Sequence, residues 1–372
     1  MTIHNVAFQH SKVPVLVVIP CLNEEEHIEH VIRKLAVEAD QIDLTIVVAD
    51  GGSNDQTRTI VQQLSVHHPV VLMDNPRRIQ STGINDAVRK YGNQAKFLIR
   101  VDAHASYPEN YCEMLLDVQA RTLADSVVVA MQAEGTTCIQ RAAAAAQNSI
   151  LGNGGSPHRN QVRDRWVDHG HHALIKMDAF NAVGGYDESF SHNEDVELDN
   201  RLSAKGFRIF LTGEVIVTYY PRRSIVGSFK QYFNIGQGRA RNFLKHRRRA
   251  NLRHLVLAAI APLLCLALLT PFSALFAIPA LAWMLACLTY GSILGARLGN
   301  PCAMASGIVA MAMQAGWSFG FFNGLLPAIS MVGRDDGNRS SRSNDPRSNG
   351  TIQRPPTAPK DDAKVDELID DR

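Results

Sequence analysis

The sequence predicts an α/β fold with a mainly parallel sheet and helices on both faces, followed by C-terminal transmembrane helices. Two observations support this prediction. Through the first 250 residues, short β-branched runs alternate with amphipathic helical patterns, as in βαβ units. Residues 255–330 then hold a single charged side chain, Arg297, which leaves no polar helix faces for water.

Strands and helices are expected to alternate from residue 13 onwards. Residues 13–20 (VPVLVVIP) form a short, continuous apolar run that is typical of a buried parallel strand. Residues 24–37 predict a helix, because Ile28, Val31 and Leu35 return on one face. Similar patterns predict strands at residues 44–49, 70–73, 97–101 and 127–131, and helices at 55–64, 80–91 and 109–121.

Polar residues follow three of these expected strands. Asn23 and Glu24 come after the first strand, Asp50 after the second, and residues 102–104 after the strand at 97–101. Ligands of such sheets bind beyond the carboxyl ends of the strands. These polar residues are therefore expected to meet in one crevice.

The chain is expected to comprise a cytoplasmic domain at residues 1–250, membrane helices at 251–330 and a disordered polar tail at 331–372. Candidate spans are 255–270, 272–293 and 302–329. A span needs about 20 apolar residues, so the first is marginal, and two to four spans are expected with three favoured. No apolar signal segment is found at the N-terminus. These features predict a multi-pass protein of the inner (plasma) membrane.

The charge and the cysteines narrow the function. The net charge of +2, with no basic stretch interleaved with aromatic residues, argues against a nucleic-acid partner. Six cysteines without a CxxC pair argue against a disulfide framework, so reduced thiols are expected.

Four motifs in this order and spacing resemble those of the family 2 glycosyltransferases, which have the GT-A fold. They are PCLNEEE (20–26), ADGGSNDQT (49–57), RVDAH (100–104) and GGYDESFSHNEDVELDNRL (184–202). The resemblance covers roughly residues 13–245 and implies a GT-A domain within residues 1–250. The DAH sequence in place of Asp-x-Asp, together with the C-terminal spans, is similar to the ExoA-type glucosyltransferases of succinoglycan biosynthesis.

The resemblance implies a nucleotide site at the first two strand ends. Pro20, Asn23 and Glu24 would contact the nucleotide, and Asp50 would accept the ring N–H of uracil, which suits an ionised carboxylate. The usual second Asp of this pair is Gly51 here. Asn23 could also cap a helix whose first turn holds acidic residues.

The resemblance also implies a divalent cation at the third strand end. Asp102 would face the ribose or the metal, and His104 would take the metal-ligand place. Imidazole suits Mn²⁺ better than Mg²⁺, so Mn²⁺ is the expected cofactor.

The fourth motif holds the candidate general base. Asp195 matches the base of the family, and a neighbouring carboxylate such as Glu194 can raise its pKa towards a useful value. The alternative is that both are ordinary acidic residues at a helix N-terminus.

Two further segments allow more than one interpretation. Residues 168–172 (DHGHH) match no zinc spacing, so a strand lining the acceptor side is expected there. Arg239 and Arg241, in QGRAR, could hold a diphosphate or meet anionic lipid headgroups. Processive relatives have a Trp after a similar segment, and its absence here predicts addition of a single sugar.

The sequence thus predicts an inverting, membrane-anchored glycosyltransferase. It would transfer one sugar, with glucose expected, from a UDP-sugar to a polyprenyl-diphosphate-linked saccharide, in contact with membrane lipids. The enzymatic alternative is a polyprenyl-phosphate sugar transferase. The non-enzymatic alternative is a membrane scaffold that retains the fold.

Overall fold

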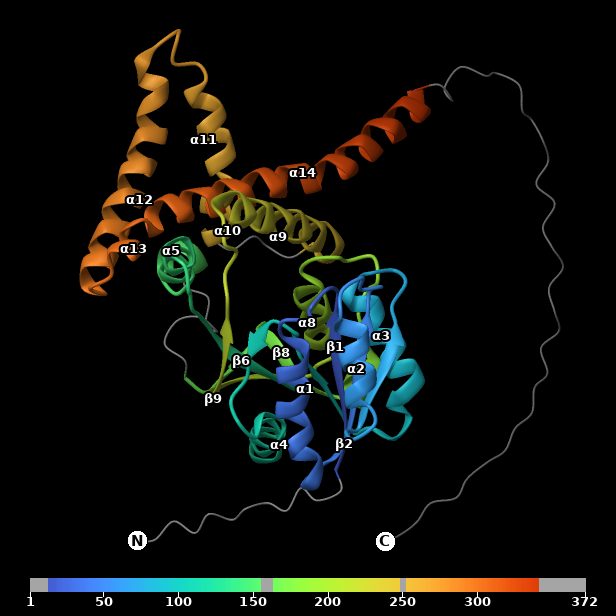
Figure 1. Ribbon diagram of the computed structural model, residues 1–372. Helices are drawn as coiled ribbons and strands as arrows, with labels where there is room; N and C mark the ends of the chain where they lie inside the picture. Colours follow the sequence, from blue (N-terminus) through green and yellow to red (C-terminus); the bar gives the residue numbers. More distant parts are fainter. Residues whose placement is uncertain (1–12, 155–162, 248–251, 341–372) are drawn as a thin grey trace, which may run out of the picture. The chain divides into compact units, whose positions relative to one another are not determined.

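The computed structural model describes residues 13–154, 163–247 and 252–340 (Figure 1). Within these ranges nine strands form one sheet in the order β3-β2-β1-β4-β8-β6-β9-β5, and β7 pairs with β9. The strands are β1 Pro14–Cys21, β2 Asp43–Asp50, β3 Val70–Asp74, β4 Phe97–Arg100, β5 Ala105–Ser106, β6 Ser126–Ala133, β7 Arg165–Val167, β8 His171–Lys176 and β9 Ile209–Tyr219.

The sheet is mixed, so the expectation of a mainly parallel sheet is correct only for part of it. β3, β2, β1 and β4 pair in parallel, as predicted. β8 lies antiparallel between β4 and β6, and β9 is parallel to β6 but antiparallel to β5 and β7. Residues 168–170 carry the chain from β7, which pairs with β9, to β8 between β4 and β6.

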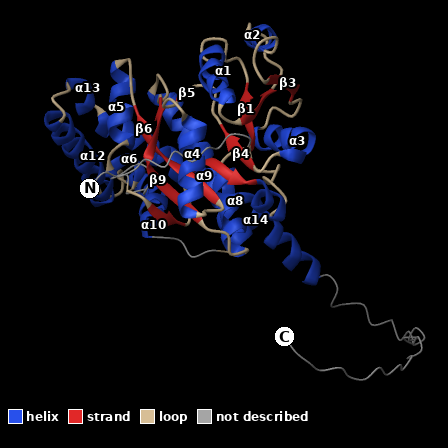
Figure 2. Cartoon of the chain, turned by 90° about the horizontal axis from the view of Figure 1, so that it is seen from below, coloured by secondary structure: helices blue, strands red, loops and turns tan. Residues whose placement is uncertain are grey.

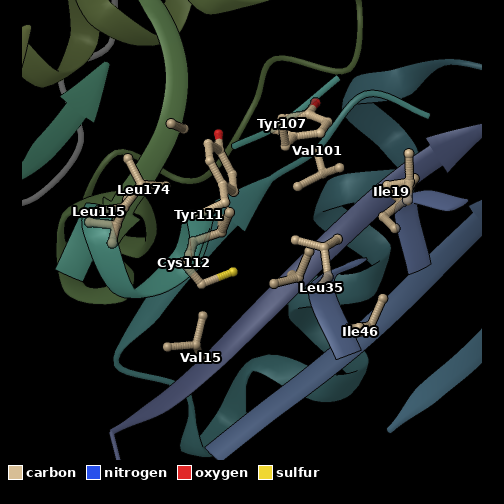
Figure 3. Close-up of a cluster of buried hydrophobic side chains, with 14 of the residues drawn as sticks. Val15, Ile19, Leu35, Ile46, Val101, Tyr107, Tyr111, Cys112, Leu115 and Leu174 are labelled. Carbon is tan, nitrogen blue, oxygen red and sulfur yellow. The ribbon is translucent and has the colours of Figure 1, made fainter. Parts of the chain in front are cut away.

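Helices lie on both sides of the strands (Figure 2). On one face α1, α2 and α4 bury an apolar cluster that includes Ile19 and Tyr111 (Figure 3). On the other face α3, α7 and α8 bury a second cluster that includes Leu16 and Phe180. Alternate residues of β1 enter the two clusters, which explains its continuous apolar run. These helices are α1 Ile28–Ala36, α2 Thr57–Leu64, α3 Gln80–Tyr91, α4 Tyr111–Thr122, α7 Met177–Ala182 and α8 Glu194–Ala204.

The first helix begins later than expected, and Asn23 is not its cap. The residue before α1 is His27, whereas Asn23 has a φ of 55° in a loop. The Asn23 side chain accepts a hydrogen bond from Asn54 N (2.9 Å), and Glu24 N donates to Thr57 Oγ1 (2.8 Å). These bonds to the loop after β2 and to the first residue of α2 hold residues 23 and 24 outside the helix.

The C-terminal helices are α9 Ile225–His246, α10 Leu252–Ala258, α11 Ile260–Ala267, α12 Ile278–Arg297, α13 Pro301–Met304 and α14 Ser306–Ser340. In the described residues one segment, Ala274–Arg297, is long and apolar enough to cross a membrane by length and composition. A shorter apolar segment, Leu252–Ala267, precedes it, and α11 and α12 lie side by side (Figure 1). The structure therefore supplies fewer spanning helices than the three favoured from the sequence.

The third expected span, residues 302–329, is α13 together with part of α14, and it packs against α9. Three glycines at four-residue spacing face the backbone of α9. A Cβ atom would lie 2.5 Å from Phe229 O if added to Gly316, and 1.9 Å from Phe233 O if added to Gly320. Such spacing allows two helices to approach closely. The helix continues to Ser340, past the expected start of the tail, and residues 341–372 lie outside the described ranges.

The expectation of reduced thiols is wrong for one pair of cysteines. Cys138, at the start of α5 (Cys138–Gln147), forms a disulfide with Cys302 of α13. The two residues are 164 positions apart, and the packing of α5 on α13 brings them together. Spacing alone could not predict this pair. The other cysteines, Cys21, Cys112, Cys265 and Cys287, are free.

Candidate functional site

Three strand ends meet at one edge of the sheet, as the sequence predicts. In the register of the sheet, Cys21 lies opposite Asp50, and Val18 lies opposite Arg100. The residues after these strands therefore form neighbouring loops. The loop after β4 brings Asp102 to the side of the sheet where α8 begins with Glu194 and Asp195.

Arg100, the last residue of β4, joins these carboxylates. Its buried guanidinium donates a hydrogen bond to Asp195 Oδ1 and lies 3.3 Å from Glu194 Oε1 and 3.6 Å from Asp102 Oδ1. Burial alone would lower the pKa of Arg100, but the charges of Asp195 and Asp102 raise it well above its ordinary value. One cation thus neutralises part of a three-carboxylate cluster.

Asp195 presents its two oxygens to different surroundings. Oδ1 accepts hydrogen bonds from Arg100 and from the hydroxyl of Tyr186 (3.0 Å). Among the described residues, none donates to Oδ2. The carboxylate is therefore held in a defined orientation, with one oxygen available for a proton from a bound hydroxyl.

The raised pKa expected in this acidic pair is found at Glu194. Burial and the charge of neighbouring Asp195 raise the pKa of Glu194 to about 7, although Arg100 opposes the shift. Glu194 is 6% exposed. A carboxyl that titrates near neutral pH can hold a proton in the centre of the site.

Asp102 is held on several sides by polar residues. Its Oδ1 accepts a hydrogen bond from Gln80 (3.0 Å), and its Oδ2 lies 3.7 Å from His171 Nε2. Burial raises the pKa of Asp102, but the charges of Arg100 and His171 outweigh it and lower the pKa overall. Asp102 is therefore ionised at neutral pH, as a metal ligand or a ribose acceptor requires.

Glu24 and His104 form a pair that the sequence did not predict. His104 Nδ1 lies 3.0 Å from Glu24 Oε1, and this hydrogen bond raises the pKa of His104. The pair connects the loop after β1 with the loop after β4. Glu24 was expected to contact the nucleotide, whereas in the structure its carboxylate contacts the candidate metal ligand.

Asp50 is enclosed by protein donors. It accepts hydrogen bonds from Ser53, from Gly52 N (3.0 Å) and from Arg58 Nη1 (2.6 Å), and its side chain is 0% exposed. Burial raises the pKa of Asp50, but the bonds from Ser53 and Arg58 lower it overall. Asp50 thus holds the turn after β2. Pro20 lies close to this turn, because it pairs with Ala49, the residue before Asp50.

The residues that connect the motifs are not evident from the sequence. Arg100 and Tyr186 lie within the family motifs, which imply no role for them, and Gln80 and Arg58 lie in segments for which the sequence predicts only a helix. An arginine at the end of a buried strand, as in RVDAH, was the visible indication for Arg100. The DHGHH segment also contributes, because His171 approaches Asp102 and His169 Nδ1 lies 2.6 Å from Asp199 Oδ2.

The residues for a divalent cation have the right chemistry but form an incomplete set. No group of three or more His, Cys, Asp or Glu side chains in the described residues could hold a metal by itself. Asp102 and His104 offer one carboxylate and one imidazole. The remaining positions would fall to phosphate and water, which is how Mg²⁺ and similar ions bind in nucleotide sites. A ligating histidine almost always donates its other ring N–H to a carboxylate, a backbone carbonyl or water, and the Glu24 carboxylate is placed for this.

Comparisons with known proteins agree with the resemblance. The model of glycosyl transferase family 2 matches residues 16–184, and that of glycosyl transferase family group 2 matches residues 101–294. The chain is 49% identical over 312 residues to succinoglycan biosynthesis protein ExoA of Rhizobium meliloti (strain 1021), covering 84% of this chain and 94% of that protein.

A solved structure has a similar fold. The mannosyltransferase PcManGT from Pyrobaculum calidifontis, in complex with GDP-Man and Mn²⁺, matches with a TM-score of 0.53 and 20% identity. The match covers 84% of this chain and 86% of that one, and it confirms the GT-A type of fold. Because both family models and the relative at 49% identity match, this chain belongs to the family 2 glycosyltransferases and is of the ExoA type.

Proposed function

We propose that this glycosyltransferase inverts the sugar that it transfers, taking it from a UDP-sugar, with glucose expected, to a lipid-linked saccharide. The observation that carries this proposal is the cluster at Arg100. The same buried guanidinium contacts Asp102, on the expected donor side, and Asp195, on the expected acceptor side. With these assignments, Arg100 would hold the donor side and the acceptor side of the site at a short, defined separation.

Asp195 is the proposed general base. An acceptor hydroxyl beside Oδ2 would give its proton to Asp195 while its oxygen bonds to the anomeric carbon, and the bond from that carbon to the diphosphate would break on the opposite face. Arg100 and Tyr186 hold Oδ1 and so orient the carboxylate for this transfer. Glu194, with its pKa of about 7, would remain largely protonated below neutral pH and so limit the negative charge around Arg100.

The nucleotide would lie against the loops after β1 and β2. Pro20 and Asn23 border this region, and Asp50 holds the turn. Asp50 could accept a uracil N–H only by exchanging one of its present donors, such as Ser53, for the ring. We therefore propose that base recognition by Asp50 is accompanied by rearrangement of the 50–53 turn.

Asp102 and His104 would hold the divalent cation, with Mn²⁺ favoured over Mg²⁺. When bound, the cation would stabilise the negative charge of the departing nucleoside diphosphate. Glu24 would fix the orientation of the His104 ring.

Nucleotide-sugar hydrolysis tests the proposed donor. Purified enzyme should release UDP from UDP-glucose faster than from UDP-galactose or UDP-N-acetylglucosamine, and faster than it releases GDP from GDP-mannose. A preference for GDP-mannose would contradict the UDP assignment. Transfer to a lipid phosphate instead of a lipid-linked saccharide would select the polyprenyl-phosphate alternative.

The metal assignment predicts that His104→Ala needs more Mn²⁺ for its half-maximal rate, by about tenfold or more, since losing even a residue that orients a metal ligand typically costs about 10- to 100-fold in affinity. His104→Asp should shift preference towards Mg²⁺, which favours oxygen ligands. Because Glu24 raises the pKa of His104, protons should compete with Mn²⁺ at a higher pH than for an unperturbed histidine. Titration of both metals against the three proteins checks this.

His67→Ala is a matched control, because His67 lies in the turn after α2, away from this site. It should leave the Mn²⁺ titration unchanged. Equal Mn²⁺ dependence in the wild type and His104→Ala would show that His104 is not a ligand.

We also propose that the enzyme is anchored by its apolar helices with residues 1–250 in the cytoplasm. Segments Leu252–Ala267 and Ala274–Arg297 would enter the bilayer as a hairpin, with Arg297 returning to the cytoplasmic surface. The close packing of Gly316 and Gly320 on α9 keeps this part of α14 beside the catalytic domain.

Alkaline phosphatase fused after Ser330 should therefore be inactive, because the hairpin returns the chain to the cytoplasm. A fusion after Phe272, at the tip of the hairpin, should be active if the hairpin crosses the bilayer. Reporter activity and protein level are measured together for both fusions. An active fusion after Ser330 would instead support three crossings.

A further inference from the structure

Arg239, in the middle of α9, has no counter-charge among the described residues. Its Nε is buried and makes no hydrogen bond, and no described carboxylate forms an ion pair with its guanidinium. Burial and then the charge of Arg253 lower the pKa of Arg239 to about 10, which still leaves it charged. By contrast, the buried guanidinium of Arg100 lies beside three carboxylates. An unpaired charge removed from water is unfavourable unless an anion joins it.

Helical spacing places Arg239 near the contact between α9 and the start of α8. Residues 235, 239, 242 and 246 share one face of α9 by helical spacing. On this face Ile235 O accepts a hydrogen bond from Asn193 Nδ2 (2.6 Å), and Asn242 Nδ2 donates to Asn193 O (3.0 Å). Asn193 is the residue before α8, whose first two residues are Glu194 and Asp195. By the same spacing Arg239 also neighbours Gly236, where an added Cβ atom would lie 2.1 Å from Trp317 O of α14, so Arg239 lies between the sides of α9 that contact α8 and α14.

Two more basic residues lie beside Arg239 at the start of the apolar segment. They are Arg253 and His254 in α10, and the charges of Arg239, Arg253 and His169 all act on the His254 ring. The His254 ring also stacks on Trp317 of α14, with 6.0 Å between ring centroids. The basic cluster formed by Arg239, Arg253 and His254 thus lies where α9, α10 and α14 meet.

His169 connects this cluster with α8, the helix that begins with Glu194 and Asp195. It bonds to Asp199, which is one turn after Asp195 and so on the same face of α8. The basic cluster therefore has the candidate base on one side and the first apolar helix on the other. A ligand that fits both sides is an anion with an apolar tail. Arginines bind phosphate oxygens with paired, charge-assisted hydrogen bonds, and two arginines suit a diphosphate.

We propose that Arg239, together with Arg253 and His254, binds the diphosphate of a prenyl-diphosphate-linked acceptor. This inference rests on the proposed function, because it assigns the acceptor of the same reaction. The prenyl chain would follow α10 into the bilayer, and the sugar on the diphosphate would extend towards Asp195. Arg239 would then position the acceptor hydroxyl.

The test compares wild type, Arg239→Gln, Arg239→Lys and Lys230→Gln, purified as the full chain in detergent. Lys230→Gln is the matched control, since Lys230 is an exposed cation on the same helix. The probes are farnesyl diphosphate, farnesol and UDP with Mn²⁺, with affinities measured by calorimetry. Arg239→Gln should weaken the binding of farnesyl diphosphate by about tenfold or more, as expected for loss of charge-assisted hydrogen bonds. Arg239→Lys should weaken this binding less. In the Arg239 variants the affinities for farnesol and UDP should change less than about twofold, and in Lys230→Gln all three affinities should change less than about twofold.

Thermal unfolding separates a binding role from a structural one. Removal of an unpaired buried charge should leave the melting temperature of Arg239→Gln unchanged or raise it. A clear fall in melting temperature, with no selective loss of farnesyl diphosphate, would overturn the proposal.

Two other sources of phosphate are distinguished by the same variants. If Arg239→Gln weakened the binding of UDP and of farnesyl diphosphate equally, the basic cluster would be a binding site for the donor, and the proposal would be overturned. Equal loss of binding to phosphatidylglycerol vesicles would assign it to lipid headgroups, with the same consequence. Failure of wild-type enzyme to hydrolyse any UDP-sugar would refute the proposed function alone, because farnesyl diphosphate binding is measured without donor.

Discussion

Replacing Asp195 by Asn should lower the turnover of sugar transfer by about a hundredfold or more while leaving the binding of UDP nearly intact, since a general base typically contributes 10²–10⁴. The amide cannot take the proton of the acceptor hydroxyl, although it can still contact Arg100 and Tyr186. Steady-state transfer rates and UDP calorimetry on the same preparation measure the two quantities separately.

The control for this variant is Glu214→Gln. Glu214 forms an exposed ion pair with Arg121, so its loss should change turnover less than about twofold. Wild-type turnover in Asp195→Asn would eliminate Asp195 as the base. Loss of UDP binding in the same variant would place Asp195 on the donor side instead.

Replacing Arg100 by Met should affect both activity and stability. The change leaves Asp102, Glu194 and Asp195 without their shared cation in a buried place. Removing one partner of a buried ion pair costs about 3–5 kcal/mol, and the misplaced Asp195 should reduce turnover by about a hundredfold. The free energy of unfolding from a denaturant titration, together with the transfer rate, checks this prediction.

Arg100→Lys and a double variant keep the test informative if Arg100→Met folds poorly. Arg100→Lys retains the charge and should recover part of the stability, but it lacks the fork that reaches several carboxylates. Adding Glu194→Gln to Arg100→Met removes one uncompensated carboxyl and should restore part of the lost stability. Arg33→Met, at an exposed pair with Glu29, should cost less than about 1 kcal/mol. Equal stability of the wild type and Arg100→Met would show that Arg100 does not hold the cluster together.

The sequence by itself determined the α/β core and the edge at which the site lies. The continuous apolar run of β1 reflects burial on both faces, and this property depends on local composition alone. The polar residues after β1, β2 and β4 meet because parallel strands end at the same edge, which follows from strand order. The family also followed from the sequence, because each of its four motifs is a contiguous stretch of residues and the four occur in a fixed order.

Only the tertiary structure decided how these residues are connected. Arg100 reaches Asp195 across 95 positions, and His104 reaches Glu24 across 80, so neither pair leaves a local pattern. The same reason applies to the disulfide between Cys138 and Cys302. Apolar composition also could not show that residues 302–329 pack on α9. Gly316, Gly320 and Gly324 make these contacts with α9, and the contacts exist only in the folded protein.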